Sequence, residues 1–262
     1  MTDRDADGRA GEGGTVIQSV DTTLRVLEAL NDVGTMGVTE LAGALDLPKS
    51  TVHNHLTTLE RRDYVVREND GYHLGCRFLE FASKTRERQP IYRIARDEVT
   101  ELAEETGELA GLIVEEHCMG VFLHRAKGRQ AVHIDTHEGK RIYLHGAALG
   151  KAMLAFMPEP RVREVVETRG LPALTDRTIT DEATLFEELD RIREEGVAFD
   201  DEERIRGLRS VAVPVRTDGG SVIGAISVAG PTSRLEGDRF REDLPQRLLS
   251  AANVIELNIT YL

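Results

Sequence analysis

Residues 38–61 read VTELAGALDLPKSTVHNHLTTLER, and this stretch decides the fold of the amino-terminal part of the chain. Apolar residues at helical spacing predict a first helix that has Thr39 as its N-cap and ends near Asp46. Leu47-Pro48 then opens a second helix, because proline suits the first helical turn. Two short helices joined by a tight turn are typical of a helix-turn-helix, whose second helix enters the major groove of DNA.

The second predicted helix, residues 49–61, has two distinct faces. Val52, Leu56 and Leu59 recur at helical spacing and form its buried stripe. The opposite face carries short polar side chains and one lysine: Lys49, Ser50, Thr51, His53, Asn54, His55 and Thr57. Such side chains can reach base edges and phosphates, and the free backbone amides at the helix start favour a phosphate there. The alternative interpretation is an ordinary helical hairpin with a solvated polar face.

The segments on either side of this motif strengthen the DNA-binding interpretation. Residues 64–74 alternate around an Asn-Asp-Gly turn, which predicts a small β-hairpin in the position of a wing. Arg62 and Arg67 are expected to contact phosphate from this region. Upstream, residues 16–32 have apolar residues at helical spacing and complete a three-helix core. We therefore expect a winged helix-turn-helix domain over residues 15–75.

Length and composition limit what the rest of the chain can be. A chain of 262 residues exceeds the usual single domain, so two domains are expected. Residues 1–14 are charged and glycine-rich, and we expect a disordered leader there. No stretch approaches the roughly 20 apolar residues of a membrane span, which predicts a soluble, cytoplasmic protein. Two isolated cysteines, Cys76 and Cys118, are expected to be free thiols.

The charge of the chain is unusual for a nucleic-acid-binding protein, because such proteins normally have a basic surface. The sequence holds 46 acidic and 33 basic residues, a formal net charge of −13. Lysine is scarce, with five residues in the whole chain. An acidic surface poor in lysine is typical of proteins from a highly saline cytoplasm, where charges are strongly screened. DNA binding would then depend on local positive groups, here Lys49, Arg61, Arg62 and Arg67.

The pattern changes beyond the predicted winged domain. Residues 76–90 predict a linker helix that ends at Pro90, and residues 91–106 predict a second amphipathic helix. Short strands are then predicted at 109–114, 120–123, 132–135, 209–216 and 221–229, and helices at 147–157, 161–169, 184–195 and 240–262. Strands that do not strictly alternate with helices indicate an α+β, sensor-like domain over residues 91–262.

The small-residue loop at 146–150 precedes one of these helices. Its free amides could hold an anion such as a carboxylate. A glycine helix cap or close packing of the helix on the sheet would explain the same residues equally well.

Ordered motifs in both domains resemble those of the IclR-type transcriptional regulators. The resemblance runs from Val16 to Tyr261 and is carried by LPKSTV at 47–52, YHLG at 72–75, LHGAALGKA at 144–152, LPALTDRTIT at 171–180, GLRSVAVPV at 207–215 and GAISVAGP at 224–231. It implies a homodimer or homotetramer that binds operator DNA through the winged domain and a small-molecule effector through a GAF-like domain. It also implies control of catabolic genes by an organic acid or a sugar-derived effector, with no cofactor.

The resemblance further implies which side chains contact the effector: Ala148, Leu149, Asp200, Ser210, Ser227 and Ala229. Three positions depart from the family pattern. Ser210 stands where many members have cysteine, and Ala229 stands where some have serine. Loss of that hydroxyl favours a more apolar ligand. Asn54 stands where many members have arginine, which alters the expected base preference.

Two other kinds of site compete with a sensor. His117, His124, His133, His137 and His145 fall in or near the predicted sheet. His133 and His137 are four residues apart, and a strand would separate them by about 13 Å, too far to chelate one metal. The acidic run at 200–203 could serve acid–base chemistry, but such runs are usually solvated faces. We therefore predict neither a metal site nor catalysis; a GAF-like binding or catalytic protein without a DNA role is the alternative.

Overall fold

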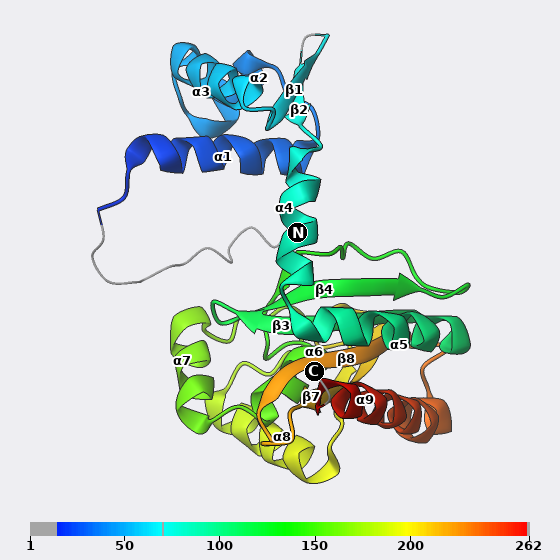
Figure 1. Ribbon diagram of the computed structural model, residues 1–262. Helices are drawn as coiled ribbons and strands as arrows, with labels where there is room; N and C mark the ends of the chain where they lie inside the picture. Colours follow the sequence, from blue (N-terminus) through cyan, green and yellow to red (C-terminus); the bar gives the residue numbers. More distant parts are fainter. Residues whose placement is uncertain (1–14, 70, 261–262) are drawn as a thin grey trace. The chain divides into compact units, whose positions relative to one another are not determined.

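The computed structural model describes residues 15–69 and 71–260, and the chain divides into two compact units between Arg88 and Gln89 (Figure 1). The leader expected at residues 1–14 lies outside the described residues. Within the described ranges, no helix is long and apolar enough to cross a membrane.

The amino-terminal unit is built from helices and one β-hairpin. Its elements are α1 Gln18–Val33, α2 Val38–Leu45, α3 Lys49–Arg61, β1 Val65–Glu68, β2 Gly71–Leu74 and α4 Arg77–Glu87. The apolar stripe of α3 is buried, and Val52 and Leu56 pack in one cluster with Val26 of α1 and Leu41 of α2. The two strands pair antiparallel from Val65 opposite Leu74 to Glu68 opposite Gly71. The unit is therefore a winged helix-turn-helix followed by a helix.

The start of α2 differs from the expectation, because its N-cap is Gly37 and not Thr39. The Glu40 carboxylate accepts a hydrogen bond from the Gly37 backbone N–H at 2.8 Å, which stabilises an earlier helix start. At the other end, Asp46 adopts a left-handed conformation with φ of 53°. The Leu47 backbone N–H donates to the Ala42 carbonyl at 3.0 Å. This tight turn directs the chain into α3.

The carboxy-terminal unit is an α+β domain around a six-stranded antiparallel sheet with strand order β5-β4-β3-β8-β7-β6. The strands are β3 Leu109–Glu116, β4 Met119–Lys127, β5 Arg141–Ile142, β6 Ala198–Asp201, β7 Leu208–Arg216 and β8 Val222–Pro231. The helices are α5 Pro90–Thr106, α6 Ala148–Ala155, α7 Glu159–Arg169, α8 Glu182–Glu195, the π-helical turn η1 Arg239–Asp243 and α9 Leu244–Thr260. One apolar cluster joins the sheet to α5 and α9, and another joins its opposite face to α6, α7 and α8.

Strand alternation sorts the side chains of β7 and β8 between these two faces. Val211, Val213 and Val228 pack in the cluster with α5 and α9. Ser210 directly precedes Val211, and Ser227 directly precedes Val228. Because neighbouring residues of a strand point to opposite faces, both serines lie on the opposite face of the sheet. The period of two thus places both serines on the side of the sheet that carries α6.

The strand predicted at residues 132–135 is wrong. The chain has no regular secondary structure between the end of β4 at Lys127 and the start of β5 at Arg141. A strand needs a hydrogen-bonded neighbour, and β4 pairs with β5 only through Gly120 and Val121. Ile134 and Thr136 of this segment instead line a cavity over the sheet, which accounts for the alternating pattern.

Strand β6 was not predicted from the sequence. It contains four residues and forms one edge of the sheet, paired antiparallel with β7 from Ala198 opposite Ala212 to Asp201 opposite Arg209. Aspartate is unfavourable in strands, so the acidic residues of β6 concealed it. The expectation of a solvated acidic face at 200–203 is also wrong, because Asp200 is 2% exposed.

Candidate functional site

The exposed face of α3 carries most of the side chains that we expected to contact DNA. Lys49, Ser50, His53 and Asn54 are exposed, and Thr51 is half-buried. No side chain caps the start of this helix, where Pro48 is the N-cap. The Thr51 backbone N–H donates to the Pro48 carbonyl at 3.0 Å. The earlier N–H groups of the first turn are available to an anion, as at other uncapped helix starts.

His55 does not belong to this exposed face. Its ring is half-buried, and Nδ1 lies 2.8 Å from the Thr23 Oγ1 of α1, within hydrogen-bond distance. The contact joins α3 to α1 inside the helix-turn-helix. The sequence interpretation put His55 among the DNA-contacting residues because it treated every polar side chain of α3 as facing outward.

The two arginines expected at phosphate lie near the hairpin. Arg62 follows the last turn of α3 and is exposed, and its backbone carbonyl accepts a hydrogen bond from Arg77 at 2.8 Å. Arg67 is exposed on β1, with its guanidinium carbon 5.8 Å from the centre of the Tyr72 ring. Both side chains are therefore solvent-accessible on the winged unit.

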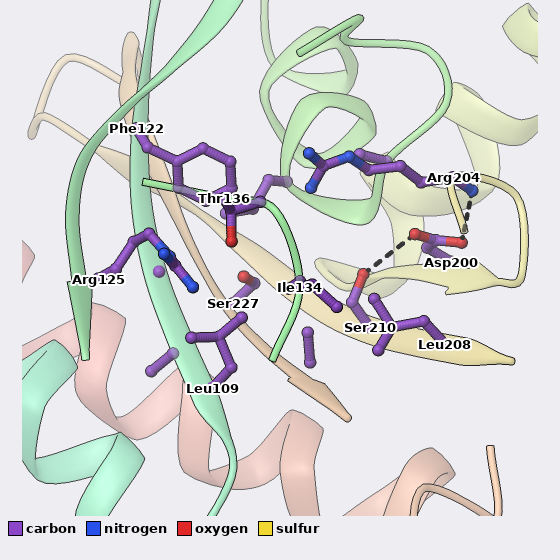
Figure 2. Close-up of a pocket in the computed structure, with 15 residues that line it drawn as sticks. Leu109, Phe122, Arg125, Ile134, Thr136, Asp200, Arg204, Leu208, Ser210 and Ser227 are labelled. Atoms are coloured by element: carbon purple, nitrogen blue, oxygen red, sulfur yellow. Dashed lines mark hydrogen bonds between the residues drawn. The ribbon is translucent and has the colours of Figure 1, made fainter. Parts of the chain in front are cut away.

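A pocket lies on the α6 side of the sheet in the carboxy-terminal unit (Figure 2). It contains about 440 Å³ of space not filled by protein atoms, with the open solvent at its mouth included. Its walls come from five strands, β3, β4, β6, β7 and β8, from the loop between β6 and β7, from the start of α6 and from the irregular segment after β4. Apolar side chains dominate them: Leu109, Phe122, Ile134, Leu149 and Leu208.

Five of the six residues implied by the family resemblance line this pocket: Leu149, Asp200, Ser210, Ser227 and Ala229. The sixth, Ala148, is fully buried in the apolar cluster beside α6 and is not part of the lining. The sequence interpretation missed Arg125, Thr136 and Arg204, which also line the pocket. A polar residue at the end of an apolar strand is the only sequence signal that could have suggested Arg125.

One cluster of polar side chains in the pocket surrounds Asp200. Its carboxylate accepts hydrogen bonds from the Glu203 backbone N–H at 2.7 Å and from the Ser210 hydroxyl at 3.3 Å. Burial raises the pKa of Asp200 to about 6, and the nearby Lys151 opposes that rise. The carboxylate is thus mainly ionised at neutral pH and presents a negative charge to this end of the pocket.

A second cluster of polar side chains faces Asp200 across the pocket. Figure 2 shows Arg125, Thr136 and Ser227 gathered on one side, with Asp200 and Ser210 on the other. The pocket therefore has Arg125 on one side and Asp200 on the other, with the Arg204 side chain also in its lining, and its remaining walls are mainly apolar. Such a combination of apolar walls and a few placed polar groups suits a small polar molecule.

Behind the pocket lies a buried ion-pair network. The Lys151 ammonium of α6, whose side chain is 1% exposed, lies 2.5 Å from a Glu203 carboxylate oxygen and 3.2 Å from Glu188 of α8. Burial raises the pKa of Glu203 to about 7, against the attraction of Lys151. The first and last members of the acidic run 200–203 are therefore embedded in the fold, with Asp200 at the pocket and Glu203 against Lys151 of α6.

The histidines do not form a common site. Nε2 of His145 lies 3.0 Å from the Pro172 carbonyl, and burial lowers the pKa of His145. His124 contacts Thr100 of α5, and His137 contacts the Glu138 carbonyl. Across the described residues, no three His, Cys, Asp or Glu side chains gather as a metal ion would require. The two cysteines are free thiols, with Cys76 exposed and Cys118 buried.

A winged helix-turn-helix unit and a separate unit with a small-molecule pocket define the class of DNA-binding, ligand-responsive regulators. Comparison with known proteins agrees. The model of the IclR helix-turn-helix domain matches residues 19–69, and that of the bacterial transcriptional regulator IclR C-terminal region matches residues 83–257. The chain belongs to the IclR family of transcriptional regulators, and its relatives are regulators, not enzymes.

Several curated relatives align over nearly the whole chain. The probable HTH-type transcriptional regulator ArcR of Halobacterium salinarum is 32% identical over 93% of this chain and 94% of its own length. The HTH-type transcriptional regulator XynR of Escherichia coli is 31% identical, over 92% of this chain and 98% of its own length. Both alignments include the two units.

Solved structures show the same fold. The IclR protein of Thermotoga maritima matches with a TM-score of 0.79 and 27% identity, covering 93% of this chain and 99% of that one. An IclR homolog of Microbacterium hydrocarbonoxydans, solved as a complex with 4-hydroxybenzoate, matches with a TM-score of 0.78 and 25% identity, covering 92% of this chain and 98% of that one.

Proposed function

We propose that this regulator binds operator DNA through α3 and controls catabolic genes in response to a small organic acid or sugar-derived effector. The observation that carries the proposal is the pocket beside α6, which combines apolar walls with charged side chains at both ends. Relatives named KdgR, AllR and XynR are transcriptional regulators, and one structural relative holds 4-hydroxybenzoate. An effector would act by binding one DNA-binding state of the protein better than another.

In this proposal, base contacts come from Ser50, Thr51, His53 and Asn54, while Lys49, Arg62 and Arg67 contact phosphate. Exposure of these residues on α3 and the hairpin supports the assignment, apart from the half-buried Thr51. His55, bonded to Thr23, is assigned to internal packing. Effector contacts are assigned to Leu149, Asp200, Ser210, Ser227 and Ala229, all of which line the pocket.

The same proposal includes assembly into a homodimer or homotetramer. A two-fold operator requires two copies of α3, and α4 supplies a surface that could pair them. No residue of α4 is buried within the chain, and Leu79 is 68% exposed and Phe81 49% exposed. An unpartnered apolar surface of this kind is typical of an interaction site.

Genome-wide DNA occupancy in the native host tests the function. Wild type is compared with Asn54→Ala and with the control Asn253→Ala, an exposed residue of α9. We expect discrete peaks beside catabolic genes for wild type and the control, and their loss for Asn54→Ala. A reporter gene at one peak, followed on different carbon sources, would then show whether Ser227→Ala weakens the effector response. Absence of peaks on every carbon source would contradict the proposal.

A further inference from the structure

The Arg125 side chain lines the pocket and has unused hydrogen-bonding capacity. Its Nε and one terminal nitrogen, Nη2, are buried, and neither has a hydrogen-bond partner among the residues that the structure describes. The Thr136 hydroxyl, which also lines the pocket, is buried without a partner in the same part of the chain. Buried polar groups are nearly always hydrogen-bonded, so this pair indicates a missing partner.

Sheet register explains why the Arg125 side chain reaches this place. Arg125 of β4 pairs with Gly111 of β3, and Gly111 in turn pairs with Ser227 of β8. Paired residues of neighbouring strands share a face of the sheet, so Arg125 and Ser227 lie on the pocket side. Gly111 lines the pocket between them and contributes no side chain, and the Phe122 ring packs close above it.

The missing partner is best supplied by an anion. A guanidinium with two unpaired N–H groups can hold a carboxylate through two hydrogen bonds, and these are stronger than bonds between neutral groups. Two carboxylates, those of Glu138 and Asp135, act electrostatically on Arg125, but both have other partners. Asp135 pairs with Lys140 at 3.2 Å, and Glu138 lies 3.5 Å from His124. Burial lowers the pKa of the Arg125 guanidinium, because the charged form is poorly solvated there.

The opposite end of the pocket sets the direction of the ligand. The Asp200 carboxylate would repel a second carboxylate but can accept a hydrogen bond from a hydroxyl, beside the Ser210 hydroxyl. The apolar part of the lining includes Phe122, Leu149 and Leu208. The unpaired guanidinium at one side and the hydrogen-bond acceptor at the other thus favour a molecule with a carboxylate and a hydroxyl.

We propose that the effector is a hydroxy-carboxylic acid whose carboxylate is held by Arg125 and the Thr136 hydroxyl and whose hydroxyl faces Asp200 and Ser210. The proposal deepens the proposed function, since it takes this pocket as the effector site. It places the acid group on β4 and on the segment that covers the pocket, and not at the amino-terminal end of α6.

Matched acid and amide probes test this assignment. Dissociation constants of 4-hydroxybenzoate, 4-hydroxybenzamide, glycolate and glycolamide are measured by ligand-detected NMR, all at one salt concentration. We expect wild type to bind at least one acid about tenfold or more tightly than its amide, the preference that a charge-assisted hydrogen bond supplies. Arg125→Met should abolish that preference. The control Arg129→Met, at an exposed arginine four residues further along, should keep it.

Thermal unfolding of the ligand-free protein supplies a second readout. Because Arg125 has buried nitrogens without partners, Arg125→Met should leave the melting temperature unchanged or raise it. A clear fall would show that Arg125 is a structural residue and would overturn the proposal. Equal affinity for acid and amide, acid preference in Arg125→Met, or no binding of either acid at millimolar concentration would also overturn it. An operator-binding assay on the same samples distinguishes the two proposals: retained operator binding would mean that only the assignment of the ligand has failed and not the regulator function.

Discussion

Arg125 of β4 and Ser227 of β8 lie on the same face of the sheet, each paired in register with Gly111 of the intervening strand β3. A side chain on β3 at this point would occupy the space between them. The cross-strand row Arg125–Gly111–Ser227 therefore forms part of the pocket floor, and the size of residue 111 should determine what the pocket can hold.

Gly111→Ala is expected to weaken effector binding. A Cβ atom at residue 111 would lie 3.0 Å from a ring carbon of Phe122 and 3.7 Å from the Ser227 Oγ. Phe122 must shift, and overpacking of this kind costs about 1–3 kcal/mol. Calorimetric titration with the acid that wild type binds should show at least a several-fold loss of affinity, with operator affinity of the ligand-free protein retained. Gly219→Ala, in an open loop, is the control and should bind as wild type does.

Asn54→Ala is expected to reduce sequence discrimination by the winged unit. An asparagine that reads a base edge contributes about 1–3 kcal/mol of discrimination, whereas a phosphate contact strengthens binding to all sequences alike. Fluorescence anisotropy at matched salt, with operator and scrambled duplexes, should show a larger loss for the operator. Lys49→Ala should weaken both duplexes similarly. Equal losses for both duplexes in Asn54→Ala would argue against base reading by this residue.

The contact between His55 and Thr23 should contribute to stability and not to DNA specificity. The two side chains meet at 2.8 Å in the partly buried space between α1 and α3. A double-mutant cycle with His55→Ala and Thr23→Val should give a coupling of about 1 kcal/mol in the free energy of unfolding. Thr23→Val combined with His53→Ala should be additive, because His53 is exposed. Additivity in the His55 cycle as well would show that the hydrogen bond contributes nothing.

Glu203 should make the protein more stable in mild acid than at neutral pH. Its pKa rises from the ordinary 4.5 to about 7 in the folded state, so the folded chain binds the proton more tightly than the unfolded chain. The contribution is fully present below pH 4.5 and is lost as the pH rises through about 7. Over this interval it amounts to about 3 kcal/mol, and Asp200, raised to about 6, acts in the same direction.

Urea unfolding at a series of pH values checks this prediction. The stability of wild type relative to Glu203→Gln should increase as the pH falls from about 7 toward 4.5. Glu194→Gln, at an exposed position of α8, should follow the wild-type pH dependence. A pH-independent difference between wild type and Glu203→Gln would mean that Glu203 titrates as an ordinary carboxyl group.

Much of the architecture could be predicted from the sequence because it rests on local patterns. The stripe of Val52, Leu56 and Leu59 predicted both α3 and its buried face, and the Asn-Asp-Gly turn predicted the hairpin. The strands predicted at 209–216 and 221–229 match β7 and β8. Motifs shared with a family then implied five residues of the pocket, including Ser210 and Ser227.

The errors arose where long-range contacts decide the structure. Ile134 and Thr136 alternate because they cover a pocket, and no neighbouring strand is present to make them part of the sheet. Asp200 is buried because β6 pairs with β7, which a run of acidic residues does not indicate. Ala148 precedes a lining residue, but the turn into α6 directs it into the core.

The sequence by itself determined the two-unit organisation, the DNA-binding helix and the family, because helical and strand periodicity and turn residues act over a few positions. Only the tertiary structure decided the chemistry of the pocket. Arg125, Gly111 and Ser227 are far apart along the chain and become neighbours through strand register. Whether the nitrogens of Arg125 find a partner depends on every element packed around them, and that is a property of the folded chain alone.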